Sequence, residues 1–360
     1  MPVASHPVSA RKQTPGRRIK AAARKVRELA IVGHSLASTS HPVMAQIVPM
    51  RRCNLSCAYC NEYDDFSKPV PIDEMVRRID HLGRLGTNII TISGGEPLLN
   101  PQLFLLCSLL REEDVRLTLL TTGLLLQKCA AEVAANFDDV IVSLDGPSEV
   151  HDKIRRVPGA FALIQSGVKS VRKHRADVRI TARTTVQKAN HRSLRETVRA
   201  ARELNLDGIS FLAADLTSSA FNRPLVWPAS RQDEIGLSVA EACELEAEIE
   251  ALIAETSCGT EGGFVAETPE KLRRIARQFR VQLGLQHAES PVCNAPWVSA
   301  VIEVDGTVRP CFFHPSIGNL RDATLESIIN GSAARGFREN LAIPGNPICR
   351  RCVCSLHHRS

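Results

Sequence analysis

The chain has 360 residues, of which 44% are hydrophobic and 23% charged, and its formal net charge is +6. This composition is typical of a globular protein with one large domain and a smaller one. It excludes a membrane-spanning chain, because no run approaches the roughly 18 apolar residues of a span. The N-terminus also lacks the apolar stretch of a secretory signal, so we expect a cytoplasmic protein.

Much of the positive charge lies between Arg11 and Arg27, in a basic N-terminal extension over residues 1–43. Basic arms can bind nucleic acid or anionic lipid. A solvated, partly disordered tail leading into a helix near 18–38 explains the charge more simply. Aromatic residues make up only 4% of the chain, so nucleic acid is not an expected partner.

From residue 44 the chain alternates short β-rich runs with amphipathic stretches. Strands are expected at 45–50, 87–93, 115–122, 138–146, 178–186 and 208–214. Helices are expected at 72–85, 101–113, 124–135, 160–174 and 193–205. Six β/α units in series predict an α/β fold, a parallel sheet curved into a partial (β/α)6 barrel over 44–256. The loops at the carboxyl ends of the strands carry the chemistry in such folds.

After the sixth strand the alternation stops. Ser238 and Glu241 form a capping box that predicts a helix over 239–255, and residues 257–288 read as a linker and a second helix that starts at Thr268 and Pro269. An Asp-Gly turn at 305–306 between two apolar runs predicts a β-hairpin. With a short helix near 324–340, it forms a small C-terminal α+β domain over 289–360.

The chain contains twelve cysteines without an export signal, which favours metal sites or buried thiols over disulfides. One group is Cys53, Cys57 and Cys60. A second group is Cys293, Cys311, Cys349, Cys352 and Cys354. The isolated cysteines are interpreted as small buried hydrophobic residues: Cys107, Cys129, Cys243 and Cys258.

The first cysteine group has C-x3-C-x2-C spacing in the loop after the first strand. Three thiolates on a short loop can hold three irons of a 4Fe–4S cube and leave the fourth iron open to a ligand. A zinc site is the alternative, and it would need a fourth ligand, for which His41 is the nearest upstream residue.

A T-I-S-G-G-E-P segment at 91–97 ends the second strand, on the next loop of the same barrel edge. Its two glycines would let the backbone approach a ligand closely. A G-G-E-P sequence on its own is more often a plain turn, but its place beside the cysteine loop makes it a partner motif.

Together these motifs resemble the radical S-adenosylmethionine (SAM) superfamily over roughly residues 44–215. Two further segments agree with it: T-T-G at 121–123, where the family often has T-N-G, and V-S-L-D-G at 142–146, followed by H-D-K-I-R at 151–155. The resemblance implies that the open iron of the cluster held by Cys53, Cys57 and Cys60 is chelated by SAM. It also implies the SAM contacts Tyr59, Gly94, Gly95, Glu96, Pro97, Thr122, Ser143, Arg155 and Thr185.

The second cysteine group reads Cys293-x17-Cys311, then 37 residues, then Cys349-x2-Cys352-x-Cys354. Four thiolates suit zinc or an iron–sulfur cube equally well on spacing alone. The layout resembles the SPASM/Twitch extension of radical SAM enzymes, which implies one auxiliary 4Fe–4S cluster. Its implied ligands are Cys293, Cys311, Cys349 and Cys352, while Cys354 is a spare thiol, an alternate ligand or a group near the substrate.

The resemblance implies an enzyme that reductively cleaves SAM to a 5′-deoxyadenosyl radical and abstracts hydrogen from a substrate. The auxiliary cluster would aid electron transfer, and a reductase, flavodoxin or ferredoxin would donate electrons. A small metabolite such as a sugar or amino-sugar is favoured over a peptide, because only a short basic segment precedes the first strand. Candidate substrate contacts are Asp215 and Asn222, in the loop after the sixth strand, and Cys354.

Three alternatives remain open at this point. A peptide-modifying maturase or a radical adenosyl transferase would use the same motifs. A non-enzymatic iron–sulfur or zinc-stabilised binding protein would not need the G-G-E-P segment or the pair Ser143 and Arg155.

Overall fold

The computed structural model describes residues 44–60, 71–85, 87, 89–112, 115–220, 223, 225–256, 263–354 and 356. The expected N-terminal helix and the residues His41, Asn222 and Cys258 lie outside this part of the chain. The described residues form one curved sheet of nine strands, in the order β6-β5-β4-β3-β2-β1-β7-β8-β9.

Six parallel strands make up the barrel, as the sequence predicts. They are β1 (Met44–Ile47), β2 (Ile89–Ile92), β3 (Arg116–Thr121), β4 (Asp139–Ser143), β5 (Arg179–Val186) and β6 (Ile209–Ala213). Buried residues alternate with partly exposed ones along β3. The period of two gives the sheet a helix-covered outer face and an inner face. Leu120 and Ile141, from the alternate positions, line an inner cavity.

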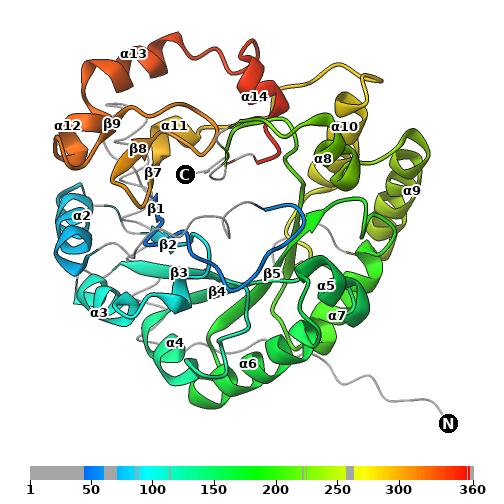
Figure 1. Ribbon diagram of the computed structural model, residues 1–360, viewed down its shortest axis with the longest axis horizontal. Coiled ribbons are helices and arrows are strands. Elements are labelled where there is room, and N and C mark those ends of the chain that lie inside the picture. Colours follow the sequence, from blue (N-terminus) through cyan, green and yellow to red (C-terminus); the bar gives the residue numbers. More distant parts are fainter. Residues whose placement is uncertain are drawn as a thin grey trace.

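Helices cover the outer face of the sheet. They are α2 (Ile72–Arg84), α3 (Leu103–Glu112), α4 (Ala130–Asn136), α6 (Ala160–His174) and α7 (Leu194–Glu203). Three further helices pack beside them: α5 (Ser148–Arg155) on α6, α9 (Val239–Glu255) on α7, and α10 (Pro269–Gln282) on α9 and β6. Figure 1 shows α3, α4, α6 and α7 along the outer side of the curved sheet. Apolar side chains such as Leu119, Val140 and Val168 form the core between these two layers.

Local sequence signals predicted the positions of several helices correctly, while other helices were not predicted. The capping box of Ser238 and Glu241 opens α9 as predicted, and Thr268 caps α10. The helix expected near 324–340 is two helices, α12 (Leu325–Ile329) and α13 (Ser332–Asn340), separated at Gly331. Four short helices were not anticipated: α5, α8 (Ala229–Ile235), α11 (Ala295–Val298) and α14 (Pro347–Arg351).

The hairpin of the C-terminal domain extends the barrel's own sheet, a pairing that the sequence did not indicate. Strand β7 (Ser299–Ile302) pairs in parallel with β1, so that Met44 lies opposite Ser299. Strands β8 (Thr307–Arg309) and β9 (Gly318–Asn319) then continue the sheet in antiparallel fashion. The expected Asp-Gly turn joins β7 to β8.

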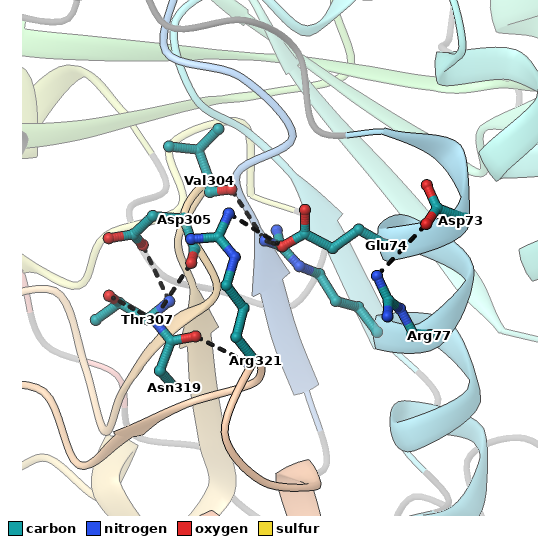
Figure 2. Close-up of polar contacts among 9 residues, drawn as sticks. Asp73, Glu74, Arg77, Val304, Asp305, Thr307, Asn319 and Arg321 are labelled. Atoms are coloured by element: carbon teal, nitrogen blue, oxygen red, sulfur yellow. Dashed lines mark hydrogen bonds and ion pairs between the residues drawn. The ribbon is translucent and has the colours of Figure 1, made fainter.

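Helix α2 holds the hairpin from the side (Figure 2). The Arg78 side chain is 1% exposed, lies 2.8 Å from Glu74 and donates to the carbonyl of Val304 at 2.9 Å. Arg321, which follows β9, lies 3.5 Å from the same Glu74 carboxylate. Because Arg78 and Glu74 are shielded from water, this pair fixes the hairpin beside β1 more firmly than the exposed Arg321 does.

Candidate active site

The cysteine loop packs directly on the G-G-E-P segment. A Cβ on Gly94 would lie 2.2 Å from the carbonyl oxygen of Met50, and one on Gly95 would lie 2.2 Å from that of Arg51. The Gly95 amide donates to Met50, and Gly94 has a φ of 131°, which favours glycine. The close approach that these glycines allow is therefore to the cysteine loop, and not only to a ligand.

A cavity of about 820 Å³, here called the cysteine-loop cavity, opens beside this contact. Ten of the residues predicted to bind iron or SAM line it: Cys53, Cys57, Tyr59, Cys60, Gly94, Gly95, Thr122, Ser143, Arg155 and Thr185. They come from the cysteine loop, from the carboxyl ends of β2 to β5 and, for Arg155, from the end of α5, as expected for this fold. Ser93 and Arg183 also line the cavity and were not singled out from the sequence.

Glu96 is fully buried and links the segment after β2 to the end of β3 by hydrogen bonds. Its carboxylate accepts hydrogen bonds from the Thr121 hydroxyl at 2.9 Å, from the Thr122 amide at 2.7 Å and from the Leu98 amide at 3.0 Å. Burial raises the pKa of this carboxyl. Neither Glu96 nor Pro97 is among the lining residues, so the geometry favours a positioning role in which Glu96 holds Thr122 at the cavity wall.

Asp145 is the buried centre of the polar network on the other wall. Its carboxylate accepts from the Tyr59 hydroxyl at 3.1 Å and the Thr185 amide at 3.0 Å, and it lies 2.8 Å from the Arg155 guanidinium. Arg155 lies over the Tyr59 ring at 5.5 Å and donates to the Cys57 sulfur at 3.6 Å. No role of Asp145 was predicted from the sequence, although its place in L-D-G at a strand end was an available signal.

Ionisation in this cavity follows from burial. Burial raises the pKa of Cys53 to about 12 and also raises that of Cys57, which Arg155 opposes. Burial disfavours the charge of Arg155, but Asp145 outweighs it and raises the pKa of Arg155. A buried thiol ionises when a metal binds it, and Arg155 supplies a fixed positive charge for an anionic ligand.

The second cysteine group surrounds a cavity of about 940 Å³, here called the C-terminal cavity. All five predicted residues line it: Cys293, Cys311, Cys349, Cys352 and Cys354. Asn346 caps α14, and its side chain accepts from the Cys349 amide at 3.1 Å, which orients that cysteine. Apolar residues such as Val301, Phe313 and Ile343 make up much of the remaining wall.

His314 lies next to this cysteine set and was missed in the sequence. Its Nε2 is 3.2 Å from the Cys349 sulfur, and its ring packs edge-on against Phe337 at 4.8 Å. Burial lowers the pKa of His314. The C-x2-H spacing from Cys311 was a signal that could have found it. A group that bonds to a metal-ligating sulfur tunes the metal that this sulfur holds.

The donor sets suit the groups that the sequence predicts. Three thiols border the cysteine-loop cavity beside a buried cation. Five thiols border the C-terminal cavity, which is enough to supply all four ligands of a second cluster. Among the described residues, no three His, Cys, Asp or Glu side chains are placed around a single metal ion. Thiolates are the usual ligands of iron–sulfur clusters.

Asp215 occupies a different place from the one expected of a substrate contact. It is buried, its carboxylate lies 2.9 Å from Arg223, and the Ser218 hydroxyl donates to it. The Arg223 guanidinium stacks on Trp227 at 4.0 Å. Asp215 lines neither cavity, so this arrangement favours a structural role for it.

The isolated cysteines differ in burial. Cys107 is buried in the core, as predicted, and Cys129 is half-buried. Cys243 is exposed on α9, so its interpretation as a buried hydrophobic residue is wrong.

Comparison with known families identifies both parts of the chain. Residues 47–211 match the radical SAM superfamily, and residues 293–353 match the SPASM iron–sulfur cluster-binding domain. This chain belongs to the radical SAM superfamily. The two matches confirm that the protein is an enzyme with a SAM-binding 4Fe–4S cluster, an auxiliary cluster and SAM as cofactors.

The relatives of this radical SAM protein differ in what they act on. It is 30% identical to an AdoMet-dependent heme synthase of Methanosarcina barkeri over 58% of this chain and 64% of that protein. It is 26% identical to the antilisterial bacteriocin subtilosin biosynthesis protein AlbA of Bacillus subtilis, over 80% of this chain and 60% of AlbA. The chain thus spans less than two thirds of the length of either relative.

A solved structure with the same fold is native anSMEcpe with bound AdoMet and Cp18Cys peptide. It is 18% identical, the match covers 82% of each chain, and the TM-score is 0.58. Within the described part of this chain, none of the helices is long and apolar enough to cross a membrane.

Proposed function

We propose that this enzyme abstracts hydrogen from a small, non-peptide substrate held between the two cysteine-lined cavities. The observation that carries the proposal is a third cavity of about 710 Å³, here called the polar cavity. Arg183 lines both the polar cavity and the cysteine-loop cavity. Cys354 lines both the polar cavity and the C-terminal cavity. A substrate there would lie between SAM and the auxiliary cluster.

We assign the cofactor ligands by cavity. Cys53, Cys57 and Cys60 would hold the SAM-binding cluster, and four of the five C-terminal cysteines would hold the auxiliary one. When bound, the first cluster and SAM supply the 5′-deoxyadenosyl radical. The chain's own part is to orient SAM through Arg155 and Tyr59 and to keep water from the radical.

The lining of the polar cavity supports a small molecule, since a few charged side chains converge on it from a strand and a helix. A named relative that makes heme is consistent with a non-peptide substrate. The second candidate is peptide modification, which the likeness to AlbA over 80% of this chain favours. A radical adenosyl transferase differs from both in its product, which would carry the adenosyl group.

Substrate-dependent formation of 5′-deoxyadenosine tests the proposal. The reconstituted enzyme is incubated anaerobically with SAM, dithionite and the low-molecular-mass fraction of an extract of the cells that make this protein. One portion of that fraction is treated with protease beforehand, and a second portion is left untreated. We expect stimulation that survives protease and free 5′-deoxyadenosine as the product. Stimulation abolished by protease would establish the peptide alternative, and an adenosylated product would establish the transferase.

Variants of the two cysteine groups separate the clusters. Replacing Cys53, Cys57 and Cys60 by Ala should abolish SAM cleavage, because the ligands of the SAM-binding iron are gone. Replacing Cys349 and Cys352 by Ala should leave slow, uncoupled cleavage but end substrate turnover. Iron analysis is the control, with about eight irons in the wild type and about four in each variant. Wild-type turnover in the second variant would show that its cluster is structural only.

A further inference from the structure

The polar cavity is walled by parts of the chain that lie far apart in sequence. One wall is the carboxyl half of β5 and β6, with Arg183 and Leu212. The opposite wall is one face of α10, and the C-terminal tail closes the side at Cys354. The α10 residues follow the i, i+3, i+4, i+7 spacing of a single helix face: Lys271, Arg274, Ile275 and Gln278.

Two of the polar residues on this face hold the tail in place. Arg274 donates to the carbonyl of Cys352 at 2.5 Å, and Gln278 donates to the same oxygen at 3.0 Å. Burial lowers the pKa of Arg274. These two side chains therefore have a structural partner, and they fix the wall against which a ligand would rest.

Arg183 and Lys271 have no such partner. Arg183 donates to the Ser210 hydroxyl at 3.3 Å, and it is exposed within the mouth of the barrel. Lys271 is exposed in the first turn of α10. Among the described residues, neither cation has a carboxylate within 4.0 Å. The cavity therefore presents two cations from opposite walls, and both also act through space on the Glu267 carboxylate.

The cavity has one acidic residue, and that residue is already bonded. Glu267 accepts the amide of Phe211 at 2.9 Å, and burial raises the pKa of its carboxyl. With Arg183, Lys271 and Arg274 against Glu267, the wall carries an excess of positive charge. Such an excess in a low-dielectric cleft attracts and orients an anionic group.

We propose that the polar cavity binds a carboxylate group of the substrate through Arg183 and Lys271. The proposal rests on the function proposed above and narrows it to a carboxylate-bearing small molecule. The planar guanidinium of Arg183 suits two-pronged binding of a carboxylate, while the Lys271 ammonium adds a point charge. Because Arg183 also lines the cysteine-loop cavity, a carboxylate held there places the adjoining carbons next to SAM.

Glutarate is the probe, since it is a small molecule that carries the carboxylate group the proposal requires, and glutaramide is its uncharged counterpart. Calorimetric titration is done on anaerobically reconstituted, SAM-loaded protein at low salt. We expect saturable glutarate binding, and glutaramide should bind at least about tenfold more weakly. A hydrogen bond to a charged group contributes enough free energy to account for such a factor.

Lys271→Glu should raise the dissociation constant of glutarate at least about tenfold, while Lys271→Arg should change it by less than about threefold. Lys271→Glu is compatible with folding, because residue 271 is the third residue of α10, where Thr268 accepts its amide and acidic residues favour the helix. Lys173→Glu, at an exposed position on α6, makes the same charge change away from the cavity and should leave binding unchanged.

Equal glutarate affinity in the wild type and Lys271→Glu, or no binding to the wild type, would overturn the proposal. A change in iron content or cluster absorbance without a change in glutarate affinity would mean that Lys271 serves the auxiliary cluster instead. The proposed function fails separately, through a lack of substrate-stimulated 5′-deoxyadenosine. Glutarate binding does not depend on SAM cleavage, so the two failures can be told apart.

Discussion

Replacing Arg155 tests how the cysteine-loop cavity holds SAM. Arg155→Met keeps an unbranched side chain but removes the charge that lies 2.8 Å from Asp145, in a pair whose side chains are 7% and 0% exposed. Loss of one partner of a buried pair leaves an uncompensated charge and destabilises a protein by about 3–5 kcal/mol. We expect a decrease of this size in the free energy of unfolding, measured by urea denaturation under anaerobic conditions.

A second substitution separates the charge of Asp145 from its hydrogen bonds. Asp145→Asn removes the orphaned charge but keeps an oxygen for the Thr185 amide. Side chains in contact commonly couple by about 0.5–3 kcal/mol, so the double variant should be more stable than the sum of the single effects predicts. Additive effects would mean that the ion pair contributes no coupling to stability.

SAM affinity then identifies the ligand of Arg155. If its guanidinium also pairs with the SAM carboxylate, both Arg155→Met and the double variant should bind SAM about tenfold or more weakly. Equilibrium dialysis on proteins of equal iron content measures this. Wild-type SAM affinity in the double variant would refute the assignment, because Arg155 would then act only by neutralising Asp145.

Two other predictions follow from packing and burial. Gly95→Ala should destabilise the protein by more than about 2 kcal/mol, because the added Cβ would meet backbone atoms of Arg51. Gly336→Ala, in open space within α13, is the control and should be neutral or stabilising. Equal denaturation midpoints of the two variants would contradict this prediction. Burial lowers the pKa of His151 from 6.5 to about 3. Between pH 6.5 and pH 3 the unfolded chain therefore binds more protons at this residue than the folded protein does. The free energy of unfolding should fall as the pH drops below 6.5, by up to about 1.4 kcal/mol per pH unit. His151→Asn should remove that part of the loss, and identical pH profiles of unfolding would disprove it.

Much of the barrel could be predicted because its signals are local. Six apolar, β-rich runs alternate with amphipathic ones, and the capping box of Ser238 and Glu241 fixes the start of α9. The cysteine motifs were equally readable, since ligand spacing is a property of a short segment. Each group of cysteines gathers at one cavity, as the spacing indicated, and Cys354 also lines the polar cavity.

The features that were missed depend on pairing between distant segments. Nothing near Ser299 indicates that β7 would pair with β1, more than 250 residues earlier. The two glycines of the G-G-E-P segment signalled a close approach, but the sequence alone could not show that the cysteine loop makes it. Asp145 was visible in its motif, yet its partners Tyr59 and Arg155 are known only from the folded chain.

The same distinction explains why the motifs define the cofactors but not the substrate. The three cysteines of the first group lie in one short stretch, residues 53–60, so their spacing alone indicates the cluster that they would hold. The polar cavity exists only because β7 joins β1 and carries the C-terminal tail across to α10, where Arg274 binds the carbonyl of Cys352. Its cations, Arg183 and Lys271, come from a strand and a helix 88 residues apart and share no spacing rule.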